Sequence, residues 1–171
     1  MVARPLLFLA VATLAGPLPV LSAQKNVPGV VAKFKEKDPR LAKAFSEAYG
    51  YVVFPTVGKG GIGVGGARGK GWVYEQGKRI GKATLTQLTI GLQFGGQAYS
   101  EVIFFQDKAA LDDFTRGNFE FDAQVSAVAV TARAAGDLPY RKGIAVVTMA
   151  KGGLMYEASV GGQKFSFKPG G

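Results

Sequence analysis

Two acidic side chains, Glu120 and Asp122, are spaced so that they could act together on a substrate or a cation. Residues two apart on a β-strand point to the same face, and two carboxylates on one face suit general acid–base chemistry. Phe119 and Phe121 alternate with them and would take the buried face, which turns both acids toward solvent. We therefore favour an exposed strand and keep catalysis by this pair as a lesser alternative.

The chain contains neither histidine nor cysteine. Serine–histidine and cysteine–histidine nucleophiles, thiolate redox couples and ordinary zinc sites are therefore excluded. An enzyme would have to work with carboxylates, lysine, tyrosine or backbone groups alone. We predict that the protein is not an enzyme and that it uses no metal and no cofactor.

Residues 58–71, with the sequence GKGGIGVGGARGKG, hold eight glycines. Gly58, Gly60 and Gly63 match the spacing of the dinucleotide-binding fingerprint, but that fingerprint must be followed by a helix whose N-terminus meets the pyrophosphate. Here the glycines lead into Trp72-Val73, which is typical of a strand. We therefore assign these glycines to tight bends and close backbone approach in a curved sheet.

Helical spacing of apolar residues is found mainly between residues 24 and 50. Asp38 followed by Pro39 is a helix start, with an N-cap acceptor before proline, and Gly50 is a typical stop. This pattern predicts two short helices, or one helix broken near Asp38. A third short helix is expected over 107–114, with Asp107 as its cap.

From Tyr51 onward the apolar period changes to two, which predicts about eight short strands with glycine turns, among them a Gln76-Gly77 hairpin. Leu88 and the alternate residues up to Phe94 are expected to share one buried face. The fold class predicted is α+β, mostly β. We expect a single domain with a curled antiparallel sheet or partly closed barrel, N-terminal helices and one short interposed helix.

Residues 1–23 have the pattern of a signal peptide: a basic start at Arg4, an apolar run from Leu6 to Leu14, helix breakers, and Ser22-Ala23 for cleavage. We expect residues 24–171 to form one exported domain in the bacterial periplasm or outer envelope. No cysteine follows the apolar run, so we expect no lipoprotein anchor.

Basic residues outnumber acidic ones by 21 to 12 and concentrate in two regions. Residues 25–48 hold six basic and three acidic residues, and residues 58–82 hold six basic and one acidic residue. Such a surface attracts lipid headgroups, nucleic acid or an acidic protein. We disfavour nucleic acid because the protein is expected to be exported and no aromatic set interleaves with the arginines.

A basic amphipathic helix ahead of a basic strand region favours an anionic phospholipid membrane as the partner. The lipid-binding candidates are Lys33, Lys35, Lys37, Arg40, Lys43, Lys59, Arg68 and Lys70 for headgroups, with Val30, Val31 and Phe34 entering the acyl boundary. The same three apolar residues could instead pack into the core, which the sequence does not decide. A protein-interaction module of the envelope is the alternative function.

Four stretches, in order along the chain, resemble the SYLF domain. They are Gly50–Pro55, Lys59–Gly71, Leu92–Glu101 and Lys151–Ser159, and the likeness covers about residues 28–168. The resemblance implies a β-rich, non-enzymatic module that binds membranes. In eukaryotic members it implies phosphoinositide binding beside SH3 or FYVE domains, contact through an N-terminal amphipathic helix, and in some cases actin binding.

The resemblance transfers unevenly to this chain. The stretch that matches the membrane helix is Val27–Phe45, and no SH3 or FYVE module accompanies it. An exported bacterial protein meets actin or phosphoinositides only where a host supplies them. Affinity for anionic phospholipid is therefore the property we expect here, with actin binding restricted to a host-associated organism.

Overall fold

The computed structural model describes residues 26–62, 64–90, 96–117, 119–122, 127–133, 135–151 and 160–170. The expected signal peptide, and all of the SYLF-like stretch Lys151–Ser159 except Lys151, lie outside these ranges. The helices are α1 (Val27–Lys37), α2 (Pro39–Glu47) and α3 (Lys108–Thr115). The strands are β1 (Gly50–Ile62), β2 (Val64–Glu75), β3 (Lys78–Ile90), β4 (Gly96–Phe105), β5 (Phe119–Glu120), β6 (Val128–Ala129), β7 (Ile144–Ala150) and β8 (Gln163–Pro169).

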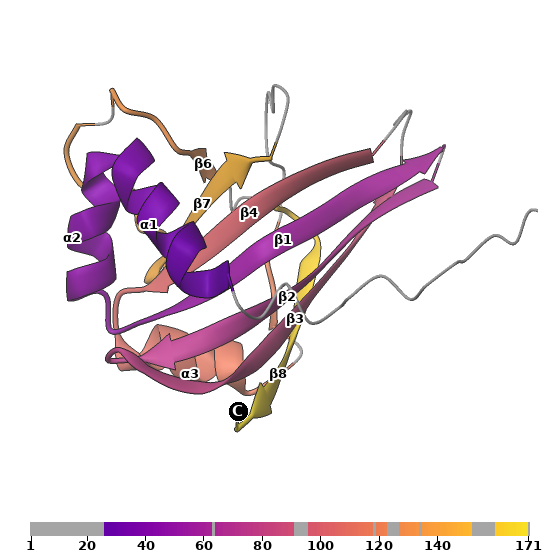
Figure 1. Ribbon diagram of the computed structural model, residues 1–171. Coiled ribbons are helices and arrows are strands. Elements are labelled where there is room, and N and C mark those ends of the chain that lie inside the picture. Colours follow the sequence, from indigo (N-terminus) through magenta and orange to yellow (C-terminus); the bar gives the residue numbers. More distant parts are fainter. Residues whose placement is uncertain are drawn as a thin grey trace, which may run out of the picture.

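The strands form one sheet in the order β5-β8-β3-β2-β1-β4-β7-β6. The sheet curls into a half-barrel, so that Gln163 on β8 reaches Tyr99 on β4, four positions away in that order. Figure 1 shows α1 and α2 on one side of the curled sheet and α3 at one end. The predicted α+β, mostly β fold is confirmed, with one correction: the sheet is mixed, because β6 pairs with β7 in parallel.

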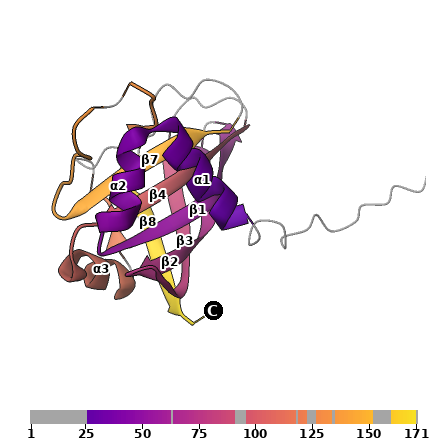
Figure 2. The same ribbon diagram turned by 60° about the vertical axis from the view of Figure 1, so that its left-hand side comes forward.

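The sheet has a buried cluster on each face. On β1, Val52 and Phe54 point to the concave inner face, where they pack with Leu85 and Phe165. Val53 points to the opposite face, which α1 and α2 cover and which we call the helix face. Figure 2 shows these two helices lying across β1, β4 and β7. Alternation along each strand therefore decides which residues face the helices.

The helical hairpin at the start of the described chain follows the sequence signals. The Asp38 carboxylate accepts a hydrogen bond from the backbone nitrogen of Arg40 at 3.1 Å, so it caps α2, and Pro39 is the first residue of that helix. Of the two alternatives left open, the structure has two helices rather than one broken helix. Asp107 likewise caps α3 by accepting from the Ala110 nitrogen at 2.9 Å, as predicted.

The glycine-rich stretch forms the two arms of the β1–β2 hairpin, and a strand rather than a helix follows it. A Cβ added to Gly71 would lie 2.7 Å from the Phe54 ring and 2.8 Å from the Val53 carbonyl oxygen. Glycine is therefore needed there for the close approach of β1 and β2. The predicted Gln76-Gly77 turn is confirmed, with φ of 46° and 78° at the two residues.

One strand prediction is wrong in phase. Leu88 was expected on a buried face, but it is 72% exposed. On β3, Ala83, Leu85 and Gln87 are buried at alternate positions, so Leu88 points to the other face. Apolar alternation shows that a strand has an apolar side, but packing against the rest of the sheet decides which side is buried. The continuation to Phe94 lies outside the described residues.

Candidate functional site

A cleft of about 340 Å³ runs between α1 and the end of β7. Lys33 and Lys37 of α1 line this cleft, and so does Lys151, the residue that follows β7. The other described residues that line it are Asn26, Val30, Ser100, Met149 and Ala150, so none of its described lining residues is acidic. Lys33 and Lys37 were among the predicted headgroup ligands, whereas Lys151 was not.

Lys151 connects the cleft to the neighbouring strands. Its Nζ donates a hydrogen bond to Thr56 Oγ1 on β1 at 2.6 Å. Thr56 pairs with Lys70 on β2, and Gly58 pairs with Arg68. Arg68 and Lys70 alternate with the inner-face residues of β2 and so share the helix face of the sheet with Trp72.

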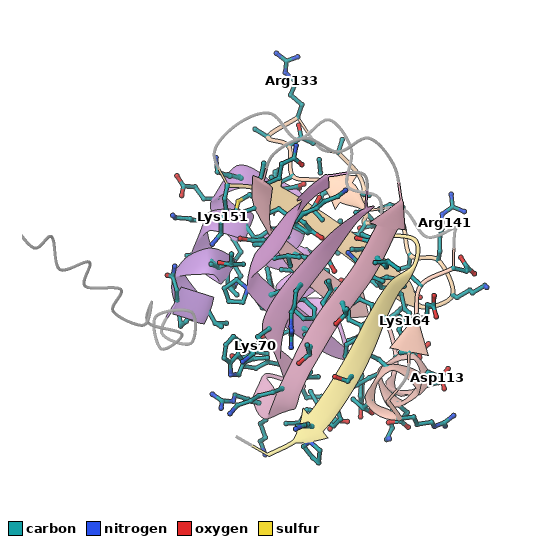
Figure 3. The ribbon with its side chains drawn as sticks, turned by 90° about the vertical axis from the view of Figure 1, so that its right-hand side faces the viewer. Lys70, Asp113, Arg133, Arg141, Lys151 and Lys164 are labelled. Atoms are coloured by element: carbon teal, nitrogen blue, oxygen red, sulfur yellow. The ribbon has the colours of Figure 1, made fainter. Side chains whose placement is uncertain are left out.

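We call these five residues, Lys33, Lys37, Arg68, Lys70 and Lys151, the basic face. Among the described residues none of the five lies in an ion pair with a carboxylate. In Figure 3, Lys151 lies beside the helices, while Lys164 and Asp113 lie on the other side of the view near β8 and α3. Partial burial of Lys151, together with the charge of Lys33, lowers the pKa of Lys151.

The remaining predicted headgroup ligands are not gathered on this face. Lys35 lies over the Phe45 ring at 5.3 Å from its centroid. Arg40 forms an ion pair with the buried carboxylate of Asp38 at 2.7 Å, and Lys43 forms one with Asp137 at 2.8 Å. These contacts hold α2 to its cap and to the segment at Asp137, so both cations already have a structural partner.

Lys59 also departs from the predicted set. It follows the inner-face residue Val57 by two positions on β1 and pairs with the inner-face residue Ala67. Its side chain therefore points to the concave face, away from Arg68 and Lys70. Sequence proximity grouped these cations, but strand alternation separates them.

The apolar lipid candidates on α1 lie against the sheet. Val30 is 3% exposed and Phe34 is fully buried, and Val31 packs at the edge of the same cluster. The structure thus has the core arrangement that the sequence left open. In this conformation Val30 and Phe34 are not available to an acyl layer, because α1 would first have to leave the sheet.

The two acidic residues considered for catalysis are exposed, and each forms an ion pair with a lysine. Glu120 lies 3.4 Å from the Lys164 ammonium, and Asp122 lies 3.2 Å from that of Lys142. Phe121 between them is buried, as the alternation predicted. No cluster of three or more acidic side chains suited to a metal ion occurs among the described residues.

Sequence reasoning missed a buried polar set on the inner face: Gln87, Tyr99, Glu101, Thr148 and Gln163. The amide of Gln163 donates to both the Tyr99 hydroxyl and the Glu101 carboxyl at 3.2 Å. Glu101 pairs with Thr148 across β4 and β7. The sequence did contain a signal for it. Glu101 is two residues from both Tyr99 and Ile103, so it shares a strand face with them and with Phe105, and all three are buried.

Burial raises the pKa of Glu101 to about 8, and the hydrogen bond from Gln163 offsets only part of that rise. The carboxyl is therefore mostly neutral at pH 7. Burial and the nearby Glu101 also raise the pKa of the Tyr99 hydroxyl. A neutral acid enclosed in the half-barrel has no access to a substrate, so we assign this set a structural role.

Comparison with known proteins matches the chain to a protein family and to a curated relative. Residues 86–169 match the sequence model of the family described as "Ysc84: Las17-binding protein actin regulator". Over 139 residues the chain is 29% identical to beta cell expansion factor A of Aeromonas veronii, which covers 80% of this chain. The matched region is 52% of the relative, so the chain spans about half the length of that protein.

The family match begins inside β3 and ends with β8, so it includes the buried polar set, α3 and Lys151. The helices α1 and α2 and the glycine-rich hairpin precede the matched residues. Among the described helices, none has the length and apolar character needed to cross a membrane.

Proposed function

The chain belongs to the Ysc84, or SYLF, family, and from this premise we propose that it binds the anionic surface of phospholipid membranes in the bacterial envelope. Family membership supports a non-enzymatic binding module in general. The signal-like segment over residues 1–23 supports export to the periplasm or outer envelope.

The observation that carries the proposal is the basic face. Its five cations come from α1, β2 and the end of β7, and they have no ion-pair partner among the described residues. Several cations elsewhere, among them Arg40, Lys43 and Lys164, lie against carboxylates, so what marks the basic face is that its unpaired cations lie on one face. Unpaired charges keep their full attraction for lipid headgroups, so this face is where anionic lipid would dock.

An exposed apolar side chain adjoins the basic face. Leu88 on β3 pairs with Gly66 on β2, two positions along the strands from the pair of Arg68 and Thr86. Leu88 alternates with the inner-face residue Leu85, so it points to the same side of the sheet as Arg68. It replaces Phe34 as the side chain placed to enter a lipid layer.

The magnitudes indicate a mainly electrostatic interaction. Each Lys or Arg near an anionic surface contributes roughly 1 kcal/mol, so the five together supply at most about 5 kcal/mol. Burying one leucine adds about 1.5–3 kcal/mol. We expect membrane binding to fall strongly as salt is added, with a smaller salt-resistant fraction of the binding remaining.

The test is co-sedimentation of the purified protein with vesicles of graded phosphatidylglycerol content, at low and at physiological salt. Binding should rise with anionic lipid, and Arg68→Gln with Lys70→Gln should weaken it. Lys78→Gln is the matched control, because it removes an exposed charge beside the Gln76-Gly77 turn, away from the basic face. Absence of binding even at low salt would overturn the proposal and direct the search to a protein partner.

A further inference from the structure

Three clefts in the described part of the chain differ in their charge. The cleft along α2 is lined by Arg40, Lys43, Glu47 and Asp137, and its cations are ion-paired. The cleft over β3 and β8 holds the pair of Lys164 and Glu120. The cleft beside α1 is lined by three lysines and, among the described residues, by no carboxylate.

This concentration of charge works against the fold. Lys33 and Lys37 are four residues apart on one helix, and like charges at that spacing destabilise a helix. Lys151 approaches them from β7, and its pKa is lowered by burial and by Lys33. Lys37 is in the last turn of α1, where a cation complements the helix dipole, but Lys33 and Lys151 have no such explanation.

We propose that the α1–β7 cleft binds a phosphate group, with the ammonium groups of Lys33, Lys37 and Lys151 as its ligands. An ammonium group is a compact charge with three donors that can turn toward the oxygens of a tetrahedral anion. A phosphate offers more charge and more acceptor oxygens than a carboxylate, which suits three converging lysines better. The cleft, at about 340 Å³, lies at the lower end of the range of small-ligand pockets.

Two further features suit an anion in this cleft. Asn26 precedes α1 and lines the cleft, and its side chain makes no capping hydrogen bond. Its amide is therefore not committed to the helix. Lys151 is held by the 2.6 Å hydrogen bond to Thr56 Oγ1, which fixes the ammonium at the sheet end of the cleft and leaves it further donors.

The phosphate has two possible sources, a lipid headgroup or a soluble phosphate compound. The first source rests on the proposed membrane function, whereas the second does not. A phosphomonoester headgroup, as in phosphatidic acid, presents the same group as inorganic phosphate. The experiment therefore needs a soluble arm and a vesicle arm.

In the soluble arm, the midpoint of thermal unfolding is measured with inorganic phosphate and with chloride at equal ionic strength. Phosphate should raise the midpoint with concentration, because a ligand that binds only the native state stabilises it by mass action. Lys33→Gln and Lys151→Gln should each weaken the apparent affinity about tenfold, since each removes a charge-assisted hydrogen bond. Both side chains belong to exposed residues, so the variants should still fold.

Lys78→Gln is again the control and should leave the phosphate effect unchanged. The inference is overturned if phosphate stabilises the protein no more than chloride does, or if Lys151→Gln responds as Lys78→Gln does. Either result would leave membrane binding through Arg68 and Lys70 intact, so the two proposals fail separately.

In the vesicle arm, binding to phosphatidic acid is compared with binding to phosphatidylglycerol at matched surface charge. A preference for phosphatidic acid that Lys151→Gln removes would identify a lipid headgroup as the source. Phosphate stabilisation without binding to either vesicle would overturn the membrane proposal and identify a soluble phosphate compound as the source. A preference that survives both lysine substitutions would overturn the cleft as the phosphate site.

Discussion

Gln163 on β8 donates a hydrogen bond from Nε2 to Oε2 of Glu101 on β4, at 3.2 Å, across the inside of the half-barrel. Both residues are fully buried. Their strands are four positions apart in the sheet, so this contact joins the two walls of the curl. A buried acid with an amide donor and no cation among its described partners remains in the fold at neutral pH by keeping its proton.

Glu101 should therefore make the stability of the protein depend on pH. Its pKa is about 8 in the folded protein, against an ordinary 4.5. Between these values the unfolded chain has released the proton and the folded chain still holds it, so the free energy of unfolding falls as pH rises. The slope from this group approaches about 1.4 kcal/mol per pH unit and ends above the folded pKa.

Glu101→Gln should remove that slope, because glutamine keeps the shape of the side chain without the titration. The measurement is urea unfolding of both proteins at pH 5, 7 and 9. Glu120→Gln is the control, since Glu120 is exposed beside Lys164. An unchanged slope in Glu101→Gln would mean that the buried carboxyl does not titrate between these pH values.

Much of the fold could be predicted from local signals. The caps Asp38 and Asp107 and the turn at Gln76-Gly77 each depend on a few neighbouring residues, and the structure confirms them. Proline is uncommon inside a sheet, yet β1 continues through Pro55 to Ile62. The register of β1 against β4 shifts between Phe54 and Val57, and this irregularity accommodates the proline.

The candidate site was harder to predict because it depends on contacts between distant segments. Lys151 and Thr56 are 95 residues apart in sequence, and nothing local to either residue indicates the hydrogen bond between them. Lys33 and Lys35 looked equivalent in the sequence, yet one lines the cleft and the other lies over Phe45. The charge composition indicated a basic surface, but the packing of α1 against the sheet determines which cations lie on it.

Phe34→Asp should unfold the protein rather than disable a membrane contact. Phe34 of α1 is fully buried between that helix and the sheet, and a charge there would lose its hydration without gaining a partner. Circular dichroism should show a loss of the cooperative thermal transition. Ala32→Asp is the matched control, because Ala32 is an exposed residue of the same helix. An intact transition in Phe34→Asp would contradict the core position of this ring.

Asp38→Ala should destabilise the protein by more than the loss of an ordinary cap. The carboxylate caps α2, forms an ion pair with Arg40 at 2.7 Å and accepts from the Thr131 nitrogen at 3.4 Å. Loss of a cap alone costs about 0.5–2 kcal/mol. We expect a cost at or above the upper end of that range in urea unfolding.

The pH dependence of this site has the opposite sign to that of Glu101. Burial raises the pKa of Asp38, but hydrogen bonds from Arg40 and Thr131 outweigh it, and the net pKa is lowered. The stabilisation is therefore present above the ordinary pKa of 3.8 and is lost as pH falls through the lower folded value. Asp137→Ala, which removes an exposed partner of Lys43, should destabilise the protein far less than Asp38→Ala, because solvent screens an exposed ion pair.

Gly71→Ala should destabilise the half-barrel through overpacking. The added methyl group would lie 2.8 Å from the Val53 carbonyl oxygen, and backbone cannot yield as a flexible side chain does. Overpacking of a core typically costs about 1–3 kcal/mol. Gly58→Ala is the control, because nothing lies within 4 Å of its added methyl group. Equal stability of the two variants would show that β1 and β2 can separate freely at Gly71.

Leu88→Ser should separate the apolar part of membrane binding from the electrostatic part. Leu88 is 72% exposed, so the substitution should change the free energy of unfolding by less than about 0.5 kcal/mol. Salt screens charges over about 10 Å at 0.1 M but does not affect apolar burial. We therefore expect Leu88→Ser to remove the binding that survives at high salt, and Arg68→Gln to reduce the binding that salt weakens. The measurement is vesicle co-sedimentation across a salt series. If Leu88→Ser leaves the salt-resistant fraction unchanged, the leucine does not enter the lipid and the basic face binds by charge alone.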